Sequence, residues 1–333
     1  MPAIGLLSDH PLDQIPASHR DLAECPPVAA FTTVTSGGYP QTSVVWCDFD
    51  GQCLRVNTMR GFAKERNMRR NPRVTLLCYD PRRPLRYLEV RGTVAEMTEA
   101  GAAGHLDALA SAYAGRPVRF FGGAIPAAFA QTETPVLCRI RPAHVVALDA
   151  TGPTRRDGAE GKPLTGPAGP VTLPIPPSHL DLLTRPICGV FTTMGNDGQP
   201  QSSLVWVDCD RGCALVNTTL QRQKGRNLLG NQKVSLLVVD PGNTSRFIQI
   251  RGDAELVSEG AHEHLDADPQ IHRPPRLLRL HLSRSAAATR NAGDMPDPPT
   301  QNHSGCDSHS RPLRCREQRH STGLSSPEGR RSR

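Results

Sequence analysis

The sequence is poor in aromatic residues and has no long hydrophobic run. Phe, Tyr and Trp make up 4% of the 333 residues, while hydrophobic residues together make up 37%, so any core must be mainly aliphatic. No segment approaches the roughly 18 apolar residues that cross a membrane. The N-terminus also lacks the basic region and apolar core of a secretory signal peptide. We therefore expect a cytoplasmic protein without a membrane partner.

Lysine is absent from the last part of the chain, although most of the positive charge lies there. Residues 267–333 contain twelve arginines, no lysine and six acidic residues, and so carry +6 of the formal net charge of +7. From residue 268 on there is also no Phe, Tyr, Trp or Val, which leaves too little apolar surface to offset the entropy lost on ordering. We predict that 267–333 is a disordered Arg/Pro/Ser-rich tail, with a composition suggestive of translation in a wrong frame. The nearly neutral remainder gives no indication of nucleic-acid binding.

Several common catalytic and metal-binding motifs are missing. The sequence has no Walker loop, GxGxxG or HExxH motif, and its ten cysteines form no CxxC pair. Most cysteines lie in apolar, strand-like runs, namely Cys47, Cys53, Cys78, Cys138 and Cys188. We expect buried free thiols rather than disulfides or a zinc site. Asp48 and Asp50 flank a hairpin signal and are better explained by turn chemistry than by a metal. We predict no metal site and identify no catalytic acid or base.

The chain contains a domain-sized duplication with a spacing of 160 residues. Ile15-Pro-Ala-Ser-His returns as Ile175-Pro-Pro-Ser-His, and Val45-Trp returns as Val205-Trp. Shared motifs continue at this spacing far beyond the length of a solenoid repeat. The sequence therefore predicts two copies of one domain.

The repeat also indicates the domain boundaries. We predict a complete domain at 1–149, a linker rich in Gly, Pro and Thr at 150–174, and an incomplete second copy at 175–266. The counterpart of the last strand of the first copy, expected at 135–147, has no recognisable match in the second copy. We therefore expect the second copy to be C-terminally truncated and to lack that strand.

The first copy has a mainly β pattern. Its expected strands are 28–35, 40–48, 53–58, 73–80, 86–96 and 135–147, and its expected helices are 11–24, 61–71 and 99–113. Gly92, within one of these strands, predicts a bulge or a close backbone approach. Six strands in hairpin order with few helices fit a small closed antiparallel barrel, because closure removes exposed sheet edges.

A strand end, a turn and a short cationic helix form the most distinctive segment of the first copy. The helix start offers free N–H groups, and Thr58, Arg60 and Lys64 add a hydroxyl, a guanidinium fork and a point charge that suit a phosphate. Lys64 and Asn67 lie three residues apart, on one helix face. The alternative is a solvated basic helix, which is what most runs of charge are.

The order of motifs resembles that of a known family. It runs Val45-Trp46, Asp50-Gly51, Asn57-Thr58, Arg60-Gly61, Lys64-x-Arg66-Asn67, Asn71-Pro72-Arg73-Val74 and Tyr87-Leu88-Glu89-Val90-Arg91-Gly92. This order is similar to that of the pyridoxamine-phosphate-oxidase-like flavin reductases, and more narrowly to their deazaflavin branch, which uses coenzyme F420. The resemblance covers 15–149 in full and 175–266 in part. It implies an FMN-binding split β-barrel, usually a homodimer with cofactor sites at the interface.

The resemblance also implies which residues hold the cofactor. The phosphate of the cofactor would be bound by Thr58, Arg60, Lys64 and Asn67. Valines and a tryptophan would line the ring of the cofactor. A plain core role for the tryptophan is an equal alternative. The complete set of candidates is Val44, Val45, Trp46, Asn57, Thr58, Arg60, Lys64, Arg66, Asn67, Thr218, Lys224 and Asn227. In the second copy Leu220 stands where Arg60 stands in the first, so we expect the second site to be impaired.

These observations predict a flavin- or deazaflavin-dependent oxidoreductase. It would transfer a hydride between reduced coenzyme F420 and a small organic acceptor, with FMN as the alternative cofactor. Six arginines could bind the polyglutamate tail of a deazaflavin or could be surface residues: Arg66, Arg69, Arg70, Arg82, Arg83 and Arg86. The alternative function is a non-catalytic flavin, deazaflavin or tetrapyrrole binding protein of the same fold. The two copies would form an intrachain pseudo-dimer, or the chain would form a homodimer through the first copy.

Overall fold

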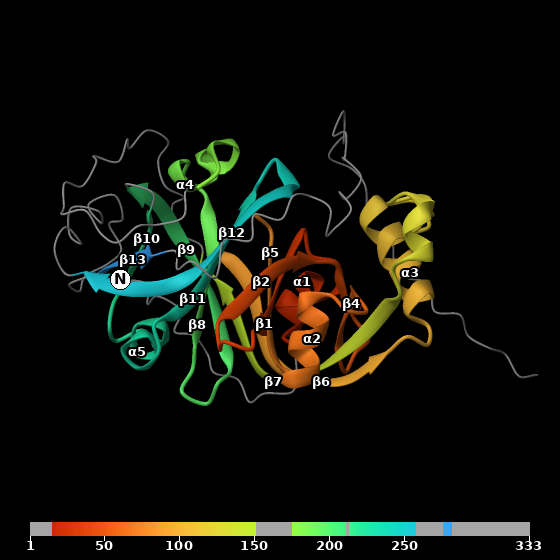
Figure 1. Ribbon diagram of the computed structural model, residues 1–333, viewed down its shortest axis with the longest axis horizontal. Coiled ribbons are helices and arrows are strands. Elements are labelled where there is room, and N and C mark those ends of the chain that lie inside the picture. Colours follow the sequence, from red (N-terminus) through yellow and green to blue (C-terminus); the bar gives the residue numbers. More distant parts are fainter. Residues whose placement is uncertain (1–14, 151–174, 211–212, 258–275, 282–333) are drawn as a thin grey trace, which may run out of the picture. The chain divides into compact units, whose positions relative to one another are not determined.

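The computed structural model describes residues 15–150, 175–210, 213–257 and 276–281, which fall within one compact unit. Both copies are built mainly from β-strands (Figure 1). The first copy contains 3₁₀ helices Ala17–His19 and Ala127–Gln131, helices α1 Asp21–Glu24, α2 Ala63–Arg70 and α3 Ala102–Ala114, and strands β1 Val28–Val34, β2 Pro40–Val45, β3 Cys47–Phe49, β4 Leu54–Met59, β5 Arg73–Tyr79, β6 Arg86–Thr98 and β7 Pro135–Asp149. The second copy contains the 3₁₀ helix Pro177–His179, helices α4 Asp181–Thr184 and α5 Gln223–Gly230, and strands β8 Cys188–Met194, β9 Pro200–Asp210, β10 Cys213–Thr218, β11 Lys233–Asp240, β12 Asn243–Val257 and β13 Arg276–His281.

The two sheets follow the same path. In the second copy the order β10-β13-β12-β11-β8-β9 closes into a barrel. In the first copy the order is β2-β1-β5-β6-β7-β4-β3, and the two end strands are consecutive in the chain, interrupted only at Trp46. All the strand pairs that the structure describes are antiparallel. The predicted fold, two tandem mainly β split barrels, is confirmed.

The last strand of the second copy corrects the sequence-based expectation. We expected it to be missing, but β13 pairs with β10 and β12, as β7 pairs with β4 and β6. Over the described residues the second copy is nevertheless the shorter one, since β13 has six residues and β7 has fifteen. The repeat did not reveal β13 because strand pairing depends on backbone hydrogen bonds, which many different sequences can make.

Other local predictions have mixed outcomes. The bulge expected at Gly92 is present, because the β6–β7 register shifts there and a Cβ on Gly92 would lie 2.4 Å from the Arg141 carbonyl oxygen. Of the leading helix expected at 11–24, the structure describes the part from residue 15 on, which contains a 3₁₀ helix followed by the four-residue α1. The five cysteines expected to be buried are buried and free. The linker and nearly all of the tail lie outside the described residues.

A shared apolar cluster joins the two copies. It combines Val28, Ala30, Val44, Leu77 and Tyr79 of the first copy with Val190, Leu237 and Val239 of the second. All seven residues of β1 are buried because alternate side chains enter this cluster and the core of the first barrel. Polar contacts accompany the cluster: Gln199 Nε2 donates to the Val74 carbonyl oxygen at 2.7 Å, and Tyr39 donates to the Asp253 carboxylate at 3.1 Å.

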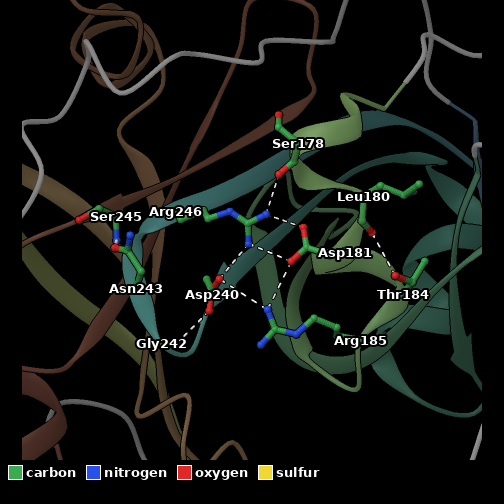
Figure 2. A network of polar contacts seen from close by, with 10 residues as sticks. All are labelled: Ser178, Leu180, Asp181, Thr184, Arg185, Asp240, Gly242, Asn243, Ser245 and Arg246. Atoms are coloured by element: carbon green, nitrogen blue, oxygen red, sulfur yellow. Dashed lines mark hydrogen bonds and ion pairs between the residues drawn. The ribbon is translucent and has the colours of Figure 1, made fainter.

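An arginine network in each copy attaches a short N-terminal helix to the sheet. In the second copy, Arg246 of β12 binds the Asp181 carboxylate, the Ser178 carbonyl oxygen at 2.6 Å and the Asp240 carboxylate at 2.8 Å (Figure 2). In the first copy, Arg86 makes the corresponding bonds to the Ser18 carbonyl oxygen and to Asp21. The networks are thus part of the repeated framework. No helix in the described parts of the chain is long and apolar enough to span a membrane.

Candidate functional site

The candidate site of the first copy lies where β4 ends and α2 begins. Gly61 makes the turn with a φ of +80°, a conformation that glycine adopts without strain. Phe62 then enters the helix in an extended conformation, and its carbonyl oxygen accepts from the Arg66 N–H at 3.0 Å. Helix α2 packs against β1 and β4 (Figure 1), so its N-terminus is held beside the end of β4.

Two polar atoms at the end of β4 are buried and unpartnered. Thr58 is 4% exposed, and its hydroxyl has no hydrogen-bond partner among the residues that the structure describes. Asn57 donates from Nδ2 to His105 Nδ1 at 2.6 Å, while its Oδ1 likewise has no partner within the described chain. Unsatisfied buried groups are costly and rare, and a missing ligand is one explanation for them. The two copies differ at the threonine hydroxyl, because that of Thr218 donates to the Thr219 carbonyl oxygen at 3.4 Å.

The cations of the turn differ in their surroundings. Arg60 is exposed and forms a two-bond ion pair with Glu99, with Nε to Oε1 at 2.7 Å, and this pairing lowers the pKa of Glu99. Lys64 is half-buried on α2. Arg66 donates to the Gly61 carbonyl oxygen and so braces the turn. A phosphate at this turn would compete with Glu99 for Arg60.

Asn67 connects α2 to the sheet. Its Nδ2 donates to Thr33 Oγ1 at 3.0 Å and to Gln41 Oε1 at 2.8 Å, and its Oδ1 accepts from Arg70 at 3.1 Å. Both amide hydrogens are therefore used within the protein. Asn227 makes equivalent bonds in the second copy, to Thr193 and Gln201.

The three candidate ring-lining residues face three different surroundings. Val45 lies in the core of the first barrel, and Val44 lies in the apolar cluster shared with the second copy. Trp46 packs under α3 in a third cluster, stacked on Tyr113 at 5.3 Å between ring centroids and edge-on to Phe120 at 5.9 Å. Strand alternation separates the first two, so the structure does not bring the three side chains onto one surface.

Sequence reasoning missed a buried polar network beside the unpartnered groups. His105 of α3 lies with Nε2 3.1 Å from Asp48 Oδ1, and because Asn57 donates to its Nδ1, Nε2 carries the hydrogen. Burial alone would raise the pKa of Asp48, but hydrogen bonds from His105 and Arg55 outweigh it and lower that pKa. The recurring His-Leu-Asp motif that contains His105 was the available signal.

The lysine of the second copy, Lys224, is buried, whereas the equivalent Lys64 of the first copy is half-buried. Lys224 is 8% exposed, and burial, helped by repulsion from Arg222, lowers its pKa to about 7. The acid near Lys224 is Glu89 of the first copy, which is 1% exposed. Its burial raises the pKa of Glu89 to about 7. The signal for Glu89 was a single acid between the apolar residues Leu88 and Val90 of β6.

Most of the arginines considered for a polyglutamate tail have partners inside the protein. Arg66 and Arg70 bind backbone carbonyl oxygens, Arg69 pairs with Glu65, Arg82 pairs with Asp80, and Arg86 belongs to the network described above. They are therefore engaged in stabilising turns and helices. In the described segments, no group of three or more His, Cys, Asp and Glu side chains is placed to hold a metal ion.

Comparisons with known proteins agree with this architecture. The family model described as pyridoxamine 5'-phosphate oxidase matches residues 15–145 and 175–284, a second segment that includes β13. No curated protein sequence is significantly similar to the chain.

Among solved structures, an F420 reductase is 30% identical over 39% of this chain and 98% of that chain, with a TM-score of 0.33. A conserved hypothetical protein from Mycobacterium tuberculosis is 22% identical over 45% of this chain and 95% of that chain, with a TM-score of 0.36. The heme storage protein HutZ from Vibrio cholerae is 16% identical over 34% of this chain and 92% of that chain, with a TM-score of 0.28. Each alignment covers less than half of this chain.

Proposed function

The chain belongs to the pyridoxamine 5'-phosphate oxidase family, and we propose that it is an oxidoreductase whose cofactor binds at the β4–α2 turn of the first copy. The proposed cofactor is coenzyme F420, in keeping with the motif order, and FMN is the alternative. When bound, either cofactor would supply the hydride for reduction of a small organic acceptor. The observation that carries the proposal is the buried, unpartnered hydroxyl of Thr58 beside the cationic start of α2.

The residues of the turn would divide the work of holding a phosphate. The Thr58 hydroxyl would donate a hydrogen bond, and Lys64 would contribute a charge from the first turn of the helix. Arg60 would release Glu99 and bind the phosphate instead. This change is feasible because the Arg60–Glu99 ion pair is exposed and hence weak. Asn67 would act indirectly, by holding α2 on β1 and β2.

The second copy would contribute framework rather than an equal site. Leu220 supplies no charge where the first copy has Arg60, and Thr218 has an internal hydrogen-bond partner. We propose that its main role is to cover β1 and β2 of the first copy, as an intrachain pseudo-dimer. The shared apolar cluster supports this arrangement because it uses side chains of both copies.

Substitution of the two corresponding lysines tests the location of the site. We expect Lys64→Ala to abolish binding of F420 and FMN, and Lys224→Ala to leave most of it, in titrations followed by cofactor fluorescence. Melting curves of both variants serve as the control for folding. Equal losses in both variants would show that the first copy has no special role.

A separate assay tests turnover. The absorbance of the reduced cofactor should fall in the presence of enones or quinones, and Lys64→Ala should remove this activity. Tight binding without turnover over a broad panel of acceptors would contradict the enzyme proposal and favour the carrier function.

A further inference from the structure

Strand β4 has a paired neighbour on only one side over its last three residues. The β3–β4 ladder ends at the pair of Cys47 and Val56, whereas the β4–β7 ladder continues to the pair of Met59 and Pro135. Within the described chain, the segment Asn57–Met59 is therefore paired on the β7 side alone. This open edge lies directly before the β4–α2 turn, so a ligand bound at the turn lies beside it.

The open edge carries an unpartnered polar atom on each face of β4. Consecutive side chains of a strand alternate, so Thr58 points to the barrel side with Val56, while Asn57 points to α3, where it contacts His105. Thr58 Oγ1 and Asn57 Oδ1 are both buried and have no partner among the described residues. The hydroxyl can donate to a phosphate oxygen. The amide oxygen can only accept, so a ligand must offer it an N–H or O–H group.

His105 determines which end of the Asn57 amide is free. Its Nε2 lies 3.1 Å from the Asp48 carboxylate, which also accepts from Arg55 Nε at 2.8 Å. A carboxylate only accepts, so Nε2 carries the hydrogen and Nδ1 of the neutral ring is an acceptor. Asn57 Nδ2 donates to this Nδ1 at 2.6 Å, which turns Oδ1 away from the ring. The His105 side chain is 8% exposed, so these bonds are shielded from water.

We propose that His105 is a positioning residue of the cofactor site, which holds the Asn57 oxygen ready to accept a hydrogen bond from a donor group of the cofactor outside its phosphate. The inference rests on the proposed function for the location of the site. FMN offers ribityl hydroxyls and a ring N–H for this bond. Inorganic phosphate fills the phosphate position alone, so the bond to Asn57 should favour FMN and leave phosphate binding unaffected.

Two substitutions separate the two bonds of His105. His105→Asn keeps an acceptor near the position of Nδ1 and loses the donor to Asp48, whereas His105→Gln keeps a donor near Nε2 and loses the acceptor for Asn57. Each variant lacks one buried hydrogen bond, so both should lose similar amounts of stability in circular dichroism melting curves. We expect His105→Gln to bind FMN roughly tenfold more weakly than the wild type, and His105→Asn to stay within about twofold of it.

Two controls identify the route of the effect. Inorganic phosphate, titrated by ³¹P NMR, should bind equally to the wild type and to both His105 variants. Asn57→Ala should weaken FMN binding by a similar factor to His105→Gln, and the double variant should lose no more than either, because both act through one bond. Asn57→Ala also supplies the comparison of FMN with phosphate if His105→Gln does not fold.

The outcomes separate this inference from the proposed function. Equal losses of FMN affinity in His105→Asn and His105→Gln, or a parallel loss of FMN and phosphate affinity, would show that His105 only stabilises the fold and would overturn the inference. Unchanged FMN affinity in a folded His105→Gln protein would overturn it as well. The proposed function stands in these cases as long as Lys64→Ala abolishes FMN binding. A wild type that binds neither FMN nor F420 would count against both.

Discussion

Replacing Asn67 by alanine should destabilise the protein without removing a direct cofactor ligand. The substitution deletes three hydrogen bonds, two donated to Thr33 and Gln41 and one accepted from Arg70. Each such bond contributes about 1 kcal/mol net, and the buried Thr33 hydroxyl loses a partner as well. The free energy of unfolding should therefore fall by about 2–4 kcal/mol.

The second copy supplies a matched variant. Asn227 donates to Thr193 at 2.9 Å and to Gln201 at 3.1 Å, and accepts from Gln223 at 2.8 Å. Asn227→Ala should therefore lower the stability by a similar amount as Asn67→Ala. At roughly 2–4 °C per kcal/mol for a domain of this size, each variant should melt about 10 °C below the wild type.

Circular dichroism melting curves, combined with FMN and F420 titrations well below the transition, distinguish the two roles of Asn67. A positioning role predicts a lower melting temperature and a modest, fewfold loss of affinity for Asn67→Ala. It also predicts a lower melting temperature and no loss of affinity for Asn227→Ala. An Asn67→Ala protein with an unchanged melting temperature and no cofactor binding would refute the reasoning and make Asn67 a direct ligand.

Two further predictions concern charge. Glu99→Gln should free Arg60 from its ion pair and strengthen cofactor binding several-fold in a fluorescence titration. The melting temperature should change little because the pair is exposed. A weaker affinity for the cofactor would show that Glu99 positions Arg60 productively. Burial raises the pKa of Glu89 from 4.5 to about 7, so the folded protein holds the proton of the Glu89 carboxyl more tightly than the unfolded chain does. The wild type should therefore lose stability relative to Glu89→Gln as the pH rises from 4.5 to about 7. Parallel pH profiles of the two unfolding free energies would contradict this assignment.

Local patterns were enough to predict most of the first barrel. The strand expected at 28–35 is β1, and the helix expected at 61–71 is α2, because hydrophobic runs, a hairpin turn and a proline stop signal them directly. The bulge at Gly92 followed from a glycine inside a strand. The break at Trp46 was not predicted, because it depends on packing against α3, which is distant in sequence.

Contacts between the copies were harder to predict. The uninterrupted burial of β1 was present in the sequence as a run without polar alternation, a pattern typical of strands covered on both faces.

Contacts between distant residues were also not predicted. The residues expected to hold the cofactor included Asn67, yet its partners lie on β1 and β2, far away in the chain. Glu89 stands in the motif that resembles the family, but its contact was not predicted because the partner, the Ser202 N–H, belongs to the other copy.

Glu89 and Gln249 are equivalent in the repeat, and their pairing with Ser202 and with Thr42 of the other copy has an evolutionary consequence. In a homodimer one codon specifies both members of such a pair, so a mutation alters both halves of the assembly at once. In a duplicated gene two codons specify them, and each half is inherited and selected separately. One half can then lose its ligand-binding function and keep only its fold. The other half can retain the ancestral ligand binding while the first half covers it.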